Sequence, residues 1–400
     1  MKQIIFDKSL SLFDEVVAIR RKLHKYPELS FCEKETSSVI KDYLASKGIA
    51  FETDVAGYGV VATVVGTAAL PGGATIALRA DMDALPIKEE SSCEYRSVNE
   101  GVMHACGHDA HTAMLLGAAS IIHDLRGSFS GKIKFVFQPG EEKLPGGASL
   151  MLANGALKDV DFVVGQHVFP DLQCGCVGFH QGPFMASCDE VNIIIRGRGG
   201  HAAKPSERSN ALLAAADIVS RLSKMFPESD AVALRSDGLL CFGSLIADGT
   251  YNVVPPQVSM KGTMRTFNEK KRAAMKSIIS ALSHDTAALF GCSADVFIEN
   301  GYPSLINDNA LTEKCRLLAS EYLDPSKVLD IPQMMTADDF AFYSQAFPSC
   351  FYRIGVSNVS KGIDSKQHTS TFDIDEDALQ IGTGLMSFIA ISLCNNIILP

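Results

Sequence analysis

The sequence predicts an α/β protein in which a mixed, mostly parallel sheet is covered by helices and a second domain is inserted. Short apolar runs of strand length alternate with segments of helical apolar spacing along most of the chain. Between residues 187 and 298 this order changes to a compact β-α-β-β-α-β pattern of the ferredoxin-like α+β type. At 400 residues the chain is also long for one hydrophobic core, so two domains are expected.

The first 186 residues carry the alternating pattern. The expected elements, in chain order, are helices over 10–25 and 34–46, strands over 60–64 and 75–78, a helix over 113–125, a strand over 132–137, a helix over 148–152 and a strand over 162–165. Pro27 follows the first helix, Gly48 ends the second, and Gly155 caps the short one. Helices on both faces of a largely parallel sheet are therefore predicted.

The inserted segment has its own periodicity. Its expected elements are a strand over 191–195, a turn over 197–200, a helix over 210–225, a strand over 253–266, a helix over 270–289 and a strand over 294–298. After Gly301 the chain again alternates between strand-like and helix-like patterns. We therefore assign residues 1–186 and 299–400 to a catalytic domain, and residues 187–298 to an inserted domain.

Composition and charge narrow the functional classes. A net charge of −10 at pH 7 and a pI near 5.5 argue against a nucleic-acid-binding surface and a polybasic membrane patch. The N-terminus has neither the apolar run nor the cleavage site of a signal peptide, and no apolar stretch of about 18 residues predicts a membrane span. Eleven cysteines without a disulfide framework favour reduced thiols in a cytoplasm.

Residues 104–111 form the most unusual segment, with three histidines, a cysteine and an aspartate in eight residues. Imidazole and thiolate are the ligands that zinc prefers. Cys106 and His108 are expected just before a helix, where extended backbone lets both side chains face one side. His104 and His111 either support the ligands or are structural, and Asp109 is either a ligand or the helix N-cap.

Polar residues follow the apolar strands where each strand ends. Asp81 and Asp83 follow residues 75–78, and His167 follows residues 162–165. Ligands of open α/β sheets gather at the carboxyl ends of the strands, so these side chains are expected to be neighbours. His368, far along the chain, is a further candidate ligand.

Glu141 and Glu142 follow the strand over 132–137 and the Pro-Gly turn. Adjacent carboxylates in an extended segment point in different directions, so one can bind a metal while the other faces the water beside it. A metal ion lowers the pKa of that water, and an unligated carboxylate can then accept its proton. The pair predicts a metal ligand next to a general base.

The inserted domain presents three candidate substrate contacts. His201 lies in a glycine-rich turn, Asn252 precedes a predicted strand, and Arg265 lies near that strand's end. Histidine and asparagine can donate hydrogen bonds to a developing oxyanion, and arginine can bind a carboxylate with two hydrogen bonds. An ordinary surface role is the alternative for each of them.

With these residues in place, the chain resembles the N-acyl amino acid amidohydrolases, which include hippurate hydrolases and indoleacetyl-amino acid hydrolases. They belong to the aminoacylase and carboxypeptidase-like metallopeptidase superfamily. The segments that carry the resemblance are residues 20–30, 79–86, 104–111, 139–142, 199–203 and 336–340, followed by His368. They cover nearly the whole chain.

The resemblance implies two divalent metal ions per subunit, zinc or manganese, with cobalt and nickel as alternatives. The implied metal ligands are Cys106, His108, Glu142, His167 and His368. Glu141 is implied as general base and then general acid. The inserted domain is implied to cover the cleft and to form a homodimer or higher oligomer, with His201 reaching a partner's active site. The implied substrate is a small N-acyl amino acid.

Asp81 departs from the wider superfamily. Related peptidases carry His-x-Asp where this chain has Asp81-Met82-Asp83, so one usual ligand is missing and Cys106 is expected to compensate. The role of Asp81 stays open, whereas Asp83 is expected to orient a histidine.

Three functions are consistent with these residues. The first is metal-dependent hydrolysis of N-acyl amino acids to a carboxylate and a free amino acid. The second is a related exopeptidase that cuts dipeptides. The third, a non-catalytic binding protein, is disfavoured because an unligated glutamate accompanies a full set of ligands.

Overall fold

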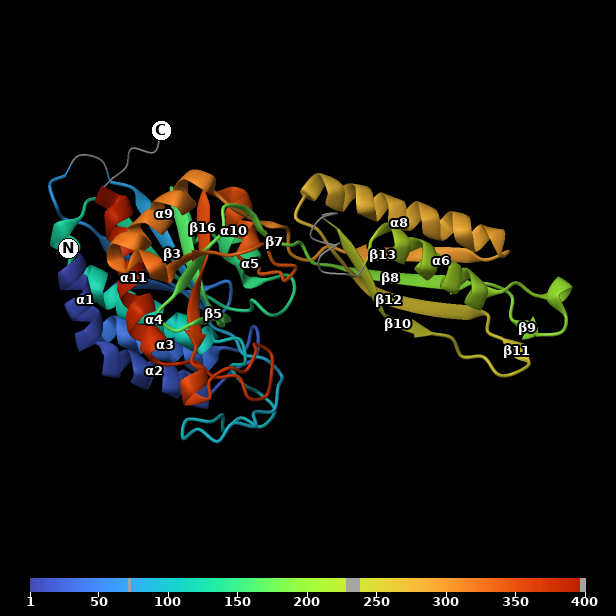
Figure 1. Ribbon diagram of the computed structural model, residues 1–400, viewed down its shortest axis with the longest axis horizontal. Helices are drawn as coiled ribbons and strands as arrows, with labels where there is room; N and C mark the ends of the chain where they lie inside the picture. Colours follow the sequence, from blue (N-terminus) through green and yellow to red (C-terminus); the bar gives the residue numbers. More distant parts are fainter. Residues whose placement is uncertain (71–72, 228–237, 396–400) are drawn as a thin grey trace. The chain divides into compact units, whose positions relative to one another are not determined.

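The computed structural model describes residues 1–70, 73–227 and 238–395 (Figure 1). The chain divides into two compact units: the first comprises Met1–Gly182, Ile306–Pro332 and Phe342–Pro400, and the second Pro183–Leu305 and Gln333–Ala341. The second unit thus extends beyond the expected residues 187–298. It does so because the backbone of Ala186 donates to Met334 and the backbone of Met334 donates to Phe184, which ties these segments together.

A mixed sheet forms the centre of the first unit. Among the described residues its strand order is β1-β2-β4-β3-β5-β16-β6-β15. The strands are β1 (Ala50–Val55), β2 (Gly59–Val65), β3 (Thr75–Asp81), β4 (Lys132–Gln138), β5 (Phe162–Gln173), β6 (Val177–Phe179), β15 (Val328–Asp330) and β16 (Ser349–Ser357). The central strands β4, β3, β5 and β16 run parallel, and β1 and β2 are antiparallel at one edge. The predicted mixed, mostly parallel sheet is confirmed.

Helices pack on this sheet and on one another. They are α1 (Lys2–Ser11), α2 (Phe13–Lys25), α3 (Lys34–Ser46), α4 (His108–Asp124), α5 (Gly147–Ala153), α9 (Asn309–Tyr322) and α11 (Asp377–Asn395). Helices α4 and α11 contact each other and β3, and α5 contacts β4 (Figure 1). The remaining short elements, β7 (Gly182–Met185), β14 (Leu305–Asn307) and α10 (Ala341–Ala346), lie where the chain passes between the units.

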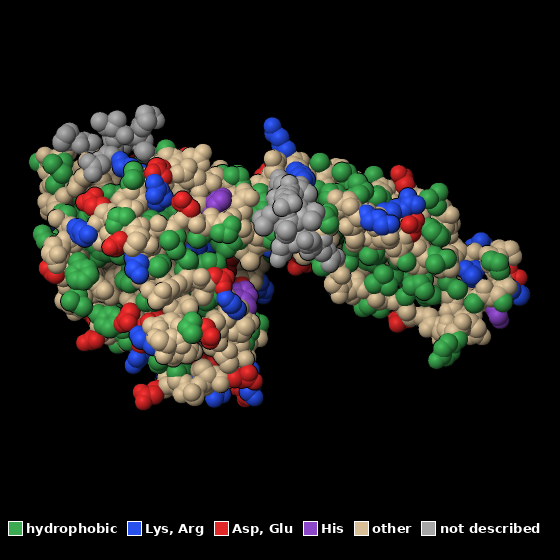
Figure 2. Space-filling view, viewed as in Figure 1, with side chains coloured by type: hydrophobic (Ala, Val, Ile, Leu, Met, Phe, Trp, Pro, Cys, Tyr) green, Lys and Arg blue, Asp and Glu red, His purple; other side chains and the backbone are tan. Residues whose placement is uncertain are grey.

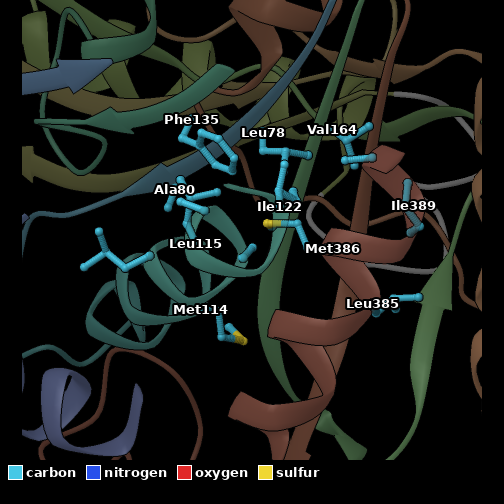
Figure 3. Packing of buried hydrophobic residues seen from close by; sticks show 14 of the residues in the cluster. Leu78, Ala80, Met114, Leu115, Ile122, Phe135, Val164, Leu385, Met386 and Ile389 are labelled. Atoms are coloured by element: carbon cyan, nitrogen blue, oxygen red, sulfur yellow. The ribbon is translucent and has the colours of Figure 1, made fainter. Parts of the chain in front are cut away.

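The hydrophobic core lies between these helices and the central strands. Figure 3 shows Leu78 of β3 and Phe135 of β4 near Leu115 of α4 and Met386 of α11, and all four are buried. Each fully buried side chain of this size contributes about 1.5–3 kcal/mol relative to exposure. The core thereby holds β3 and α4 in place, and these two elements carry most of the candidate site.

Helix α11 corrects one expectation from the sequence. The 19 residues of Asp377–Asn395 are long and apolar enough to cross a membrane by length and composition, although no such stretch was expected. In the structure 78% of its 18-residue window is buried against the protein. This burial is that of a core helix, whose apolar residues contact α4 and β3.

The second unit has the ferredoxin-like arrangement. Its strands are β8 (Asp189–Arg196), β10 (Leu239–Ile246), β12 (Gln257–Arg265) and β13 (Ser293–Glu299), and its helices are α6 (Ala211–Met225) and α8 (Glu269–Leu289). The antiparallel sheet has the order β10-β12-β8-β13, so the described strands follow β-α-β-β-α-β with the first strand in the middle. A ribbon of β9 (Gly200–His201) and β11 (Val253–Val254) completes the unit.

Two expected elements of this unit need correction. The strand expected over 253–266 is interrupted between β11 and β12 at Pro255 and Pro256, because proline has no N–H to donate to a strand ladder. The β-α-β-β-α-β pattern requires a second strand after its first helix, but no residues were assigned to it; that strand is β10, which pairs with β12.

Candidate metal centre

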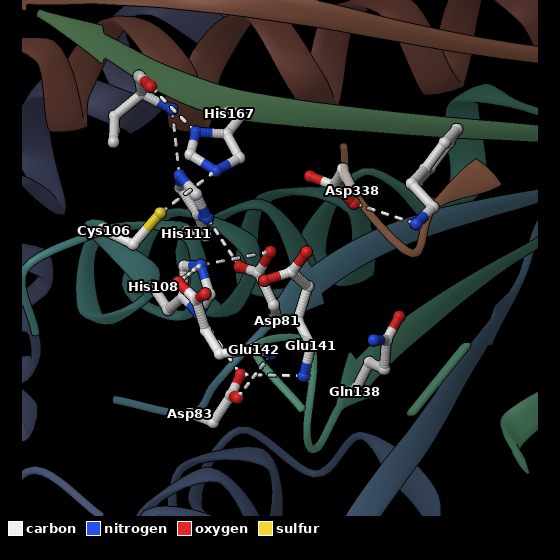
Figure 4. Close-up of polar contacts among 12 residues, drawn as sticks. Asp81, Asp83, Cys106, His108, His111, Gln138, Glu141, Glu142, His167 and Asp338 are labelled. Carbon is white, nitrogen blue, oxygen red and sulfur yellow. Dashed lines mark hydrogen bonds and ion pairs between the residues drawn. The ribbon is translucent and has the colours of Figure 1, made fainter. Parts of the chain in front are cut away.

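The candidate site lies at the carboxyl ends of the central parallel strands. Strand β3 lies between β4 and β5, and its last residue is Asp81. Helix α4 begins at His108, while Glu141 follows β4 and His167 lies in β5 (Figure 4). From β3 the chain continues to β4 on one side of it and then to β5 on its other side. Ligands of α/β sheets bind at the strand ends where the strand order reverses in this way.

His108 is the first residue of α4, so the expected extended backbone before the helix is wrong there. The reason is Gly107, which adopts a left-handed φ of 87° as the N-cap residue. A Cβ at this position would overlap the side chain of Val168, so only glycine fits. This turn still lets Cys106 and His108 both reach the site (Figure 4).

Asp83 is buried and accepts several hydrogen bonds from the site. Its Oδ1 lies 3.2 Å from Nδ1 of His108 and accepts the backbone N–H of Glu141 at 3.0 Å. Its Oδ2 accepts the backbone N–H of Glu142 at 2.9 Å. Burial opposes ionisation, but the His108 and Ser30 hydrogen bonds lower the pKa of Asp83 below its usual value. The carboxylate thus orients His108 and both glutamates, and the first of these matches the role expected from the sequence.

Two buried atoms in the site have no hydrogen-bond partner among the described residues. They are Nε2 of His108 and Oε1 of Glu142, and they lie 4.0 Å apart. Buried polar atoms normally have a partner, so a pair of facing acceptors points to a bound cation. An imidazole nitrogen and a carboxylate oxygen are suitable ligands for zinc or manganese.

The other candidate ligands continue from this pair. Nε2 of His368 lies 3.4 Å from Oε1 of Glu142, and the ligand atoms of Cys106, Glu142 and His368 all lie within 4.8 Å of one another. Nε2 of His167 lies 3.6 Å from Sγ of Cys106. Nδ1 of His167 faces the backbone oxygen of Val168 at 2.8 Å, which directs the Nε2 lone pair toward the sulfur. The structure therefore brings together all five residues expected as ligands.

Glu141 is buried and lies beside this group. One of its carboxylate oxygens is within 4.8 Å of the ligand atoms of both His108 and Glu142. As expected for adjacent residues, the two glutamates enter the site as separate groups (Figure 4). Glu141 can thus hold a proton close to the metal ligands.

His111 and Asp81 are also close, but their ligand atoms are already engaged. Nδ1 of His111 lies 2.6 Å from Oδ1 of Asp81, and Nε2 of His111 accepts the backbone N–H of Val168 at 2.9 Å. Oδ2 of Asp81 accepts a hydrogen bond from Arg79 at 2.6 Å. Burial opposes ionisation of Asp81, but the Arg79 guanidinium holds the pKa of this carboxyl well below its usual range. The structure thus favours the supporting role of His111 over a ligand role.

The chain is similar to known proteins over most of its length. A family model described as peptidase family M20/M25/M40 matches residues 77–391. The chain belongs to this peptidase family. It is a metal-dependent amidohydrolase.

Relatives of this M20 enzyme carry several activities in their names. N-acetyl-L-cysteine deacetylase of Bacillus subtilis is 37% identical over 92% of this chain and 86% of its own length. Thermostable carboxypeptidase 1 of Saccharolobus solfataricus is 34% identical over 96% of each chain. IAA-amino acid hydrolase ILR1-like 4 of Arabidopsis thaliana is 35% identical over 97% of this chain and 88% of its own.

Among solved structures, the Bacillus subtilis YXEP protein, described as a dinuclear metal binding peptidase from the M20 family, is similar throughout. Its TM-score is 0.84 at 30% identity, with 97% of this chain and 99% of that chain covered. The likeness extends over both units, so the fold class expected from the sequence is confirmed.

In this M20 enzyme, buried polar and charged side chains lie around the first turn of α4. Asp109 is not the N-cap residue of α4, because Gly107 holds that position. Oδ2 of Asp109 accepts a hydrogen bond from Nε of Arg20 at 2.8 Å and lies 2.8 Å from Nδ1 of His24. His104 is buried, with neither ring nitrogen hydrogen-bonded among the described residues, and burial lowers its pKa to about 4. These residues support the helix that carries His108.

The three substrate-contact candidates lie in the second unit. The exposed His201 and Asn252 are neighbours, since Ala202, which follows β9, donates its N–H to the backbone oxygen of Asn252 at 2.9 Å. Arg265 is the last residue of β12, whereas the His201 ribbon precedes the first residue of that strand. At about 3.4 Å per residue, the nine residues of β12 separate Arg265 from the other two. Within one chain the structure thus brings His201 and Asn252 together and leaves Arg265 at the other end of β12.

Sequence reasoning missed two residues that shape the site. Glu33 is fully buried and accepts the backbone N–H of Gly140 at 2.7 Å, and Ser30 donates to Oδ2 of Asp83 at 2.6 Å. Burial, together with the charge of Asp83, raises the pKa of Glu33 to about 7. Ser30 falls in a segment that carries the family resemblance, but no local pattern marked Glu33 as part of the site.

Proposed function

We propose that this enzyme hydrolyses the amide bond of N-acyl amino acids and releases a carboxylate and a free amino acid. The observation that carries the proposal is the arrangement of Glu141 and Glu142. Oε1 of Glu142 is buried, accepts no hydrogen bond from the described residues, and lies between Nε2 of His108 and Nε2 of His368 at 4.0 and 3.4 Å. Glu141 lies beside them, and the backbone N–H groups of Glu141 and Glu142 both donate to Asp83. A ligand and a proton acceptor are thus held next to each other.

We propose two divalent ions, zinc or manganese, held by the residues Cys106, His108, Glu142, His167 and His368. Glu142 lies close to two sets of candidate ligands: Cys106 and His368 on one side, and His108 on the other. A carboxylate shared by two sets of ligands is consistent with a pair of ions. Burial raises the pKa of the Cys106 thiol, and a cation beside it would favour the thiolate. When bound, such ions polarise a carbonyl oxygen and lower the pKa of water. Cobalt and nickel fit the same mixed donor set.

Glu141 is the proposed proton carrier. Its carboxylate accepts a proton from the water that attacks the acyl carbonyl carbon. The same proton is then donated to the amide nitrogen as the carbon–nitrogen bond breaks, which gives a carboxylic acid and an amine; the acid then loses its proton to the amine or to solvent and leaves as a carboxylate. In the second unit we propose that His201 stabilises the oxyanion and that Asn252 and Arg265 bind the substrate, with His201 acting from its own or a partner chain.

The test is the Glu141→Gln variant, assayed with acetyl-, benzoyl- and indoleacetyl-amino acids after zinc or manganese is restored. Wild-type protein should release the free amino acid from at least one of them. The variant should fold and bind the same number of metal ions, yet lose about 10²–10⁴-fold in turnover, because no carboxylate is left to move the proton. Glu52→Gln, which changes an exposed carboxylate on β1, is the control. Turnover retained by the Glu141 variant would contradict the assignment.

A second candidate is an exopeptidase that cuts dipeptides. The relative from Saccharolobus solfataricus, named a carboxypeptidase, favours it. The same metal-restored protein should be compared on an N-acyl amino acid and on the dipeptide with the same C-terminal residue. A higher kcat/KM for the dipeptide would replace the first proposal by the second.

We further propose a homodimer, or a higher oligomer, that binds neither nucleic acid nor membrane and acts in the cytoplasm. The net charge of −10 and eleven free cysteines are in keeping with this. Hydrophobic side chains are exposed on the second unit (Figure 2), including Leu212, Leu213 and Met225 of α6. Sedimentation of the purified protein at several concentrations tests the oligomeric state.

A further inference from the structure

Three consecutive backbone N–H groups of the turn after β4 donate to two buried carboxylates. Gly140 donates to Oε1 of Glu33 at 2.7 Å, Glu141 to Oδ1 of Asp83 at 3.0 Å, and Glu142 to Oδ2 of Asp83 at 2.9 Å. The turn that carries the proposed base is therefore held by side chains from distant segments of the first unit.

The Glu33 half of this arrangement comes from the loop before α3. Glu33 is the N-cap residue of α3, and its carboxylate lies at 0% exposure while reaching Gly140, 107 residues along the chain. The buried Gly140 N–H would have no acceptor without it, and a buried unpaired donor is costly. Glu33 thus fixes the residue that immediately precedes Glu141.

The neighbours of Glu33 on the same loop also contact this turn or its anchor. The Phe31 ring lies where a Cβ on Gly140 would be, and Gly140 has a left-handed φ of 62°. Phe31 itself has a φ of 64°, a conformation that aromatic residues rarely adopt. Ser30 donates to Asp83 at 2.6 Å. Strained backbone persists where surrounding structure requires it, and it is enriched at active sites.

From this geometry we propose that Glu33 is a positioning residue for catalysis, which holds the Glu141 carboxylate in place through the N–H of Gly140. The proposal rests on the proposed role of Glu141 as proton carrier. Glu33 acts as a hydrogen-bond acceptor and does not contact the reacting atoms. Because a displacement of about 1 Å in a reacting group can cost about 100-fold in rate, loosening this turn lowers kcat.

The test compares Glu33→Met, which keeps the approximate volume but removes the acceptor, with Glu33→Gln, which keeps an oxygen for the Gly140 N–H. Glu33→Met should lower kcat by about 10- to 100-fold at nearly constant KM. It should also speed hydrogen–deuterium exchange of the backbone amides of residues 140–142. Glu33→Gln should stay within about threefold of wild type in kcat and show wild-type exchange, since its amide oxygen replaces the carboxylate oxygen.

Glu28→Gln is the matched control, because Glu28 lies on the same loop and accepts backbone N–H groups of Glu35 and Thr36 at the start of α3 instead of the turn. It should leave kcat and the amide exchange of residues 140–142 unchanged. If Glu33→Met does not fold, Glu33→Asp takes its place, since its shorter side chain cannot reach Gly140.

The proposal would be overturned if Glu33→Met, or Glu33→Asp in its place, showed the same kcat and the same amide exchange as Glu33→Gln. So would a rate loss in Glu33→Met that the Glu28 control reproduces. Exchange is measured without substrate, so it reports on the turn even if the protein hydrolyses no N-acyl amino acid. A failure of the proposed function therefore gives inactive wild-type protein, whereas a failure of the Glu33 proposal gives unchanged exchange.

Discussion

Oδ1 of Asp83 lies 3.2 Å from Nδ1 of His108, which leaves Nε2 of that ring as the nitrogen that faces Glu142. The orientation of a proposed metal ligand is thus set by a carboxylate 25 residues earlier in the chain. Because Asp83 also accepts the N–H groups of Glu141 and Glu142, one side chain aligns a ligand, a second ligand and the proposed base.

Asp83→Asn should weaken metal binding about 10- to 100-fold, the usual cost of losing a partner that orients a ligand. The amide NH₂ cannot accept a hydrogen bond, so at least one of the backbone N–H groups loses its acceptor. Chelator competition on the purified protein measures the effect. Asp161→Asn, which changes an acceptor for Thr75 at the far end of β3, should leave metal affinity unchanged. Equal affinities in both variants would contradict the role of Asp83.

His108→Ala and His111→Ala should differ in kind. His108 has a buried Nε2 available for a metal, whereas both ring nitrogens of His111 are engaged by Asp81 and Val168. The first variant should bind fewer metal ions per chain. The second should keep full metal stoichiometry but lose about 1–3 kcal/mol in the free energy of unfolding, because Asp81 and the Val168 N–H lose their partner. Metal analysis and urea unfolding distinguish the two, and metal loss in His111→Ala would show that it is a ligand.

Arg20→Met should destabilise the first unit strongly. Arg20 is 1% exposed and pairs with Asp109, which is also buried, so its removal leaves this buried carboxylate with only the His24 ring beside it. A loss of about 3–5 kcal/mol is expected in the free energy of unfolding. Arg21→Met is the control: Arg21 pairs with Glu376 at 45% side-chain exposure and should cost no more than about 1 kcal/mol. Similar losses would mean that the buried pair is unimportant.

Glu33 should make the free energy of unfolding depend on pH. Its pKa is raised from 4.5 to about 7 in the folded protein, so between these values the unfolded chain releases a proton that the folded chain keeps. The folded state therefore loses stability as pH rises through this window, by about 3 kcal/mol in total, and the loss is complete above about pH 7. Relative to wild type, Glu33→Gln should be more stable at about pH 8 than at about pH 5. A constant difference in urea unfolding across pH would contradict a raised pKa.

Much of the fold followed from local pattern. Strand and helix periodicity predicted the parallel sheet, and the β-α-β-β-α-β order predicted the second unit, because each depends only on spacing along a short segment. The predicted elements that the structure corrected also have local causes. Pro255 and Pro256 broke an expected strand, and Gly107 started α4 at His108 through a backbone conformation that apolar spacing does not reveal.

The candidate site likewise has residues that the sequence identified and residues whose role only the structure showed. Cys106, His108 and the Glu141–Glu142 pair were recognisable because metal-binding side chains are dense there and follow strand ends. His111 lies in the same dense segment, yet its role depended on which atoms its two nitrogens meet. Spacing indicates which side chains can reach a site, but not which lone pairs are already used.

By itself, the sequence determined the fold class through the spacing of its apolar residues, and it gave the set of candidate metal ligands through residue type and the family resemblance. Only the tertiary structure showed that Glu33 reaches Gly140 across 107 residues and that Arg20 is enclosed with Asp109. Hydrogen bonds between distant segments, and the burial that makes them strong, exist only after the helices and strands have packed. The turn that positions Glu141 is therefore a product of packing.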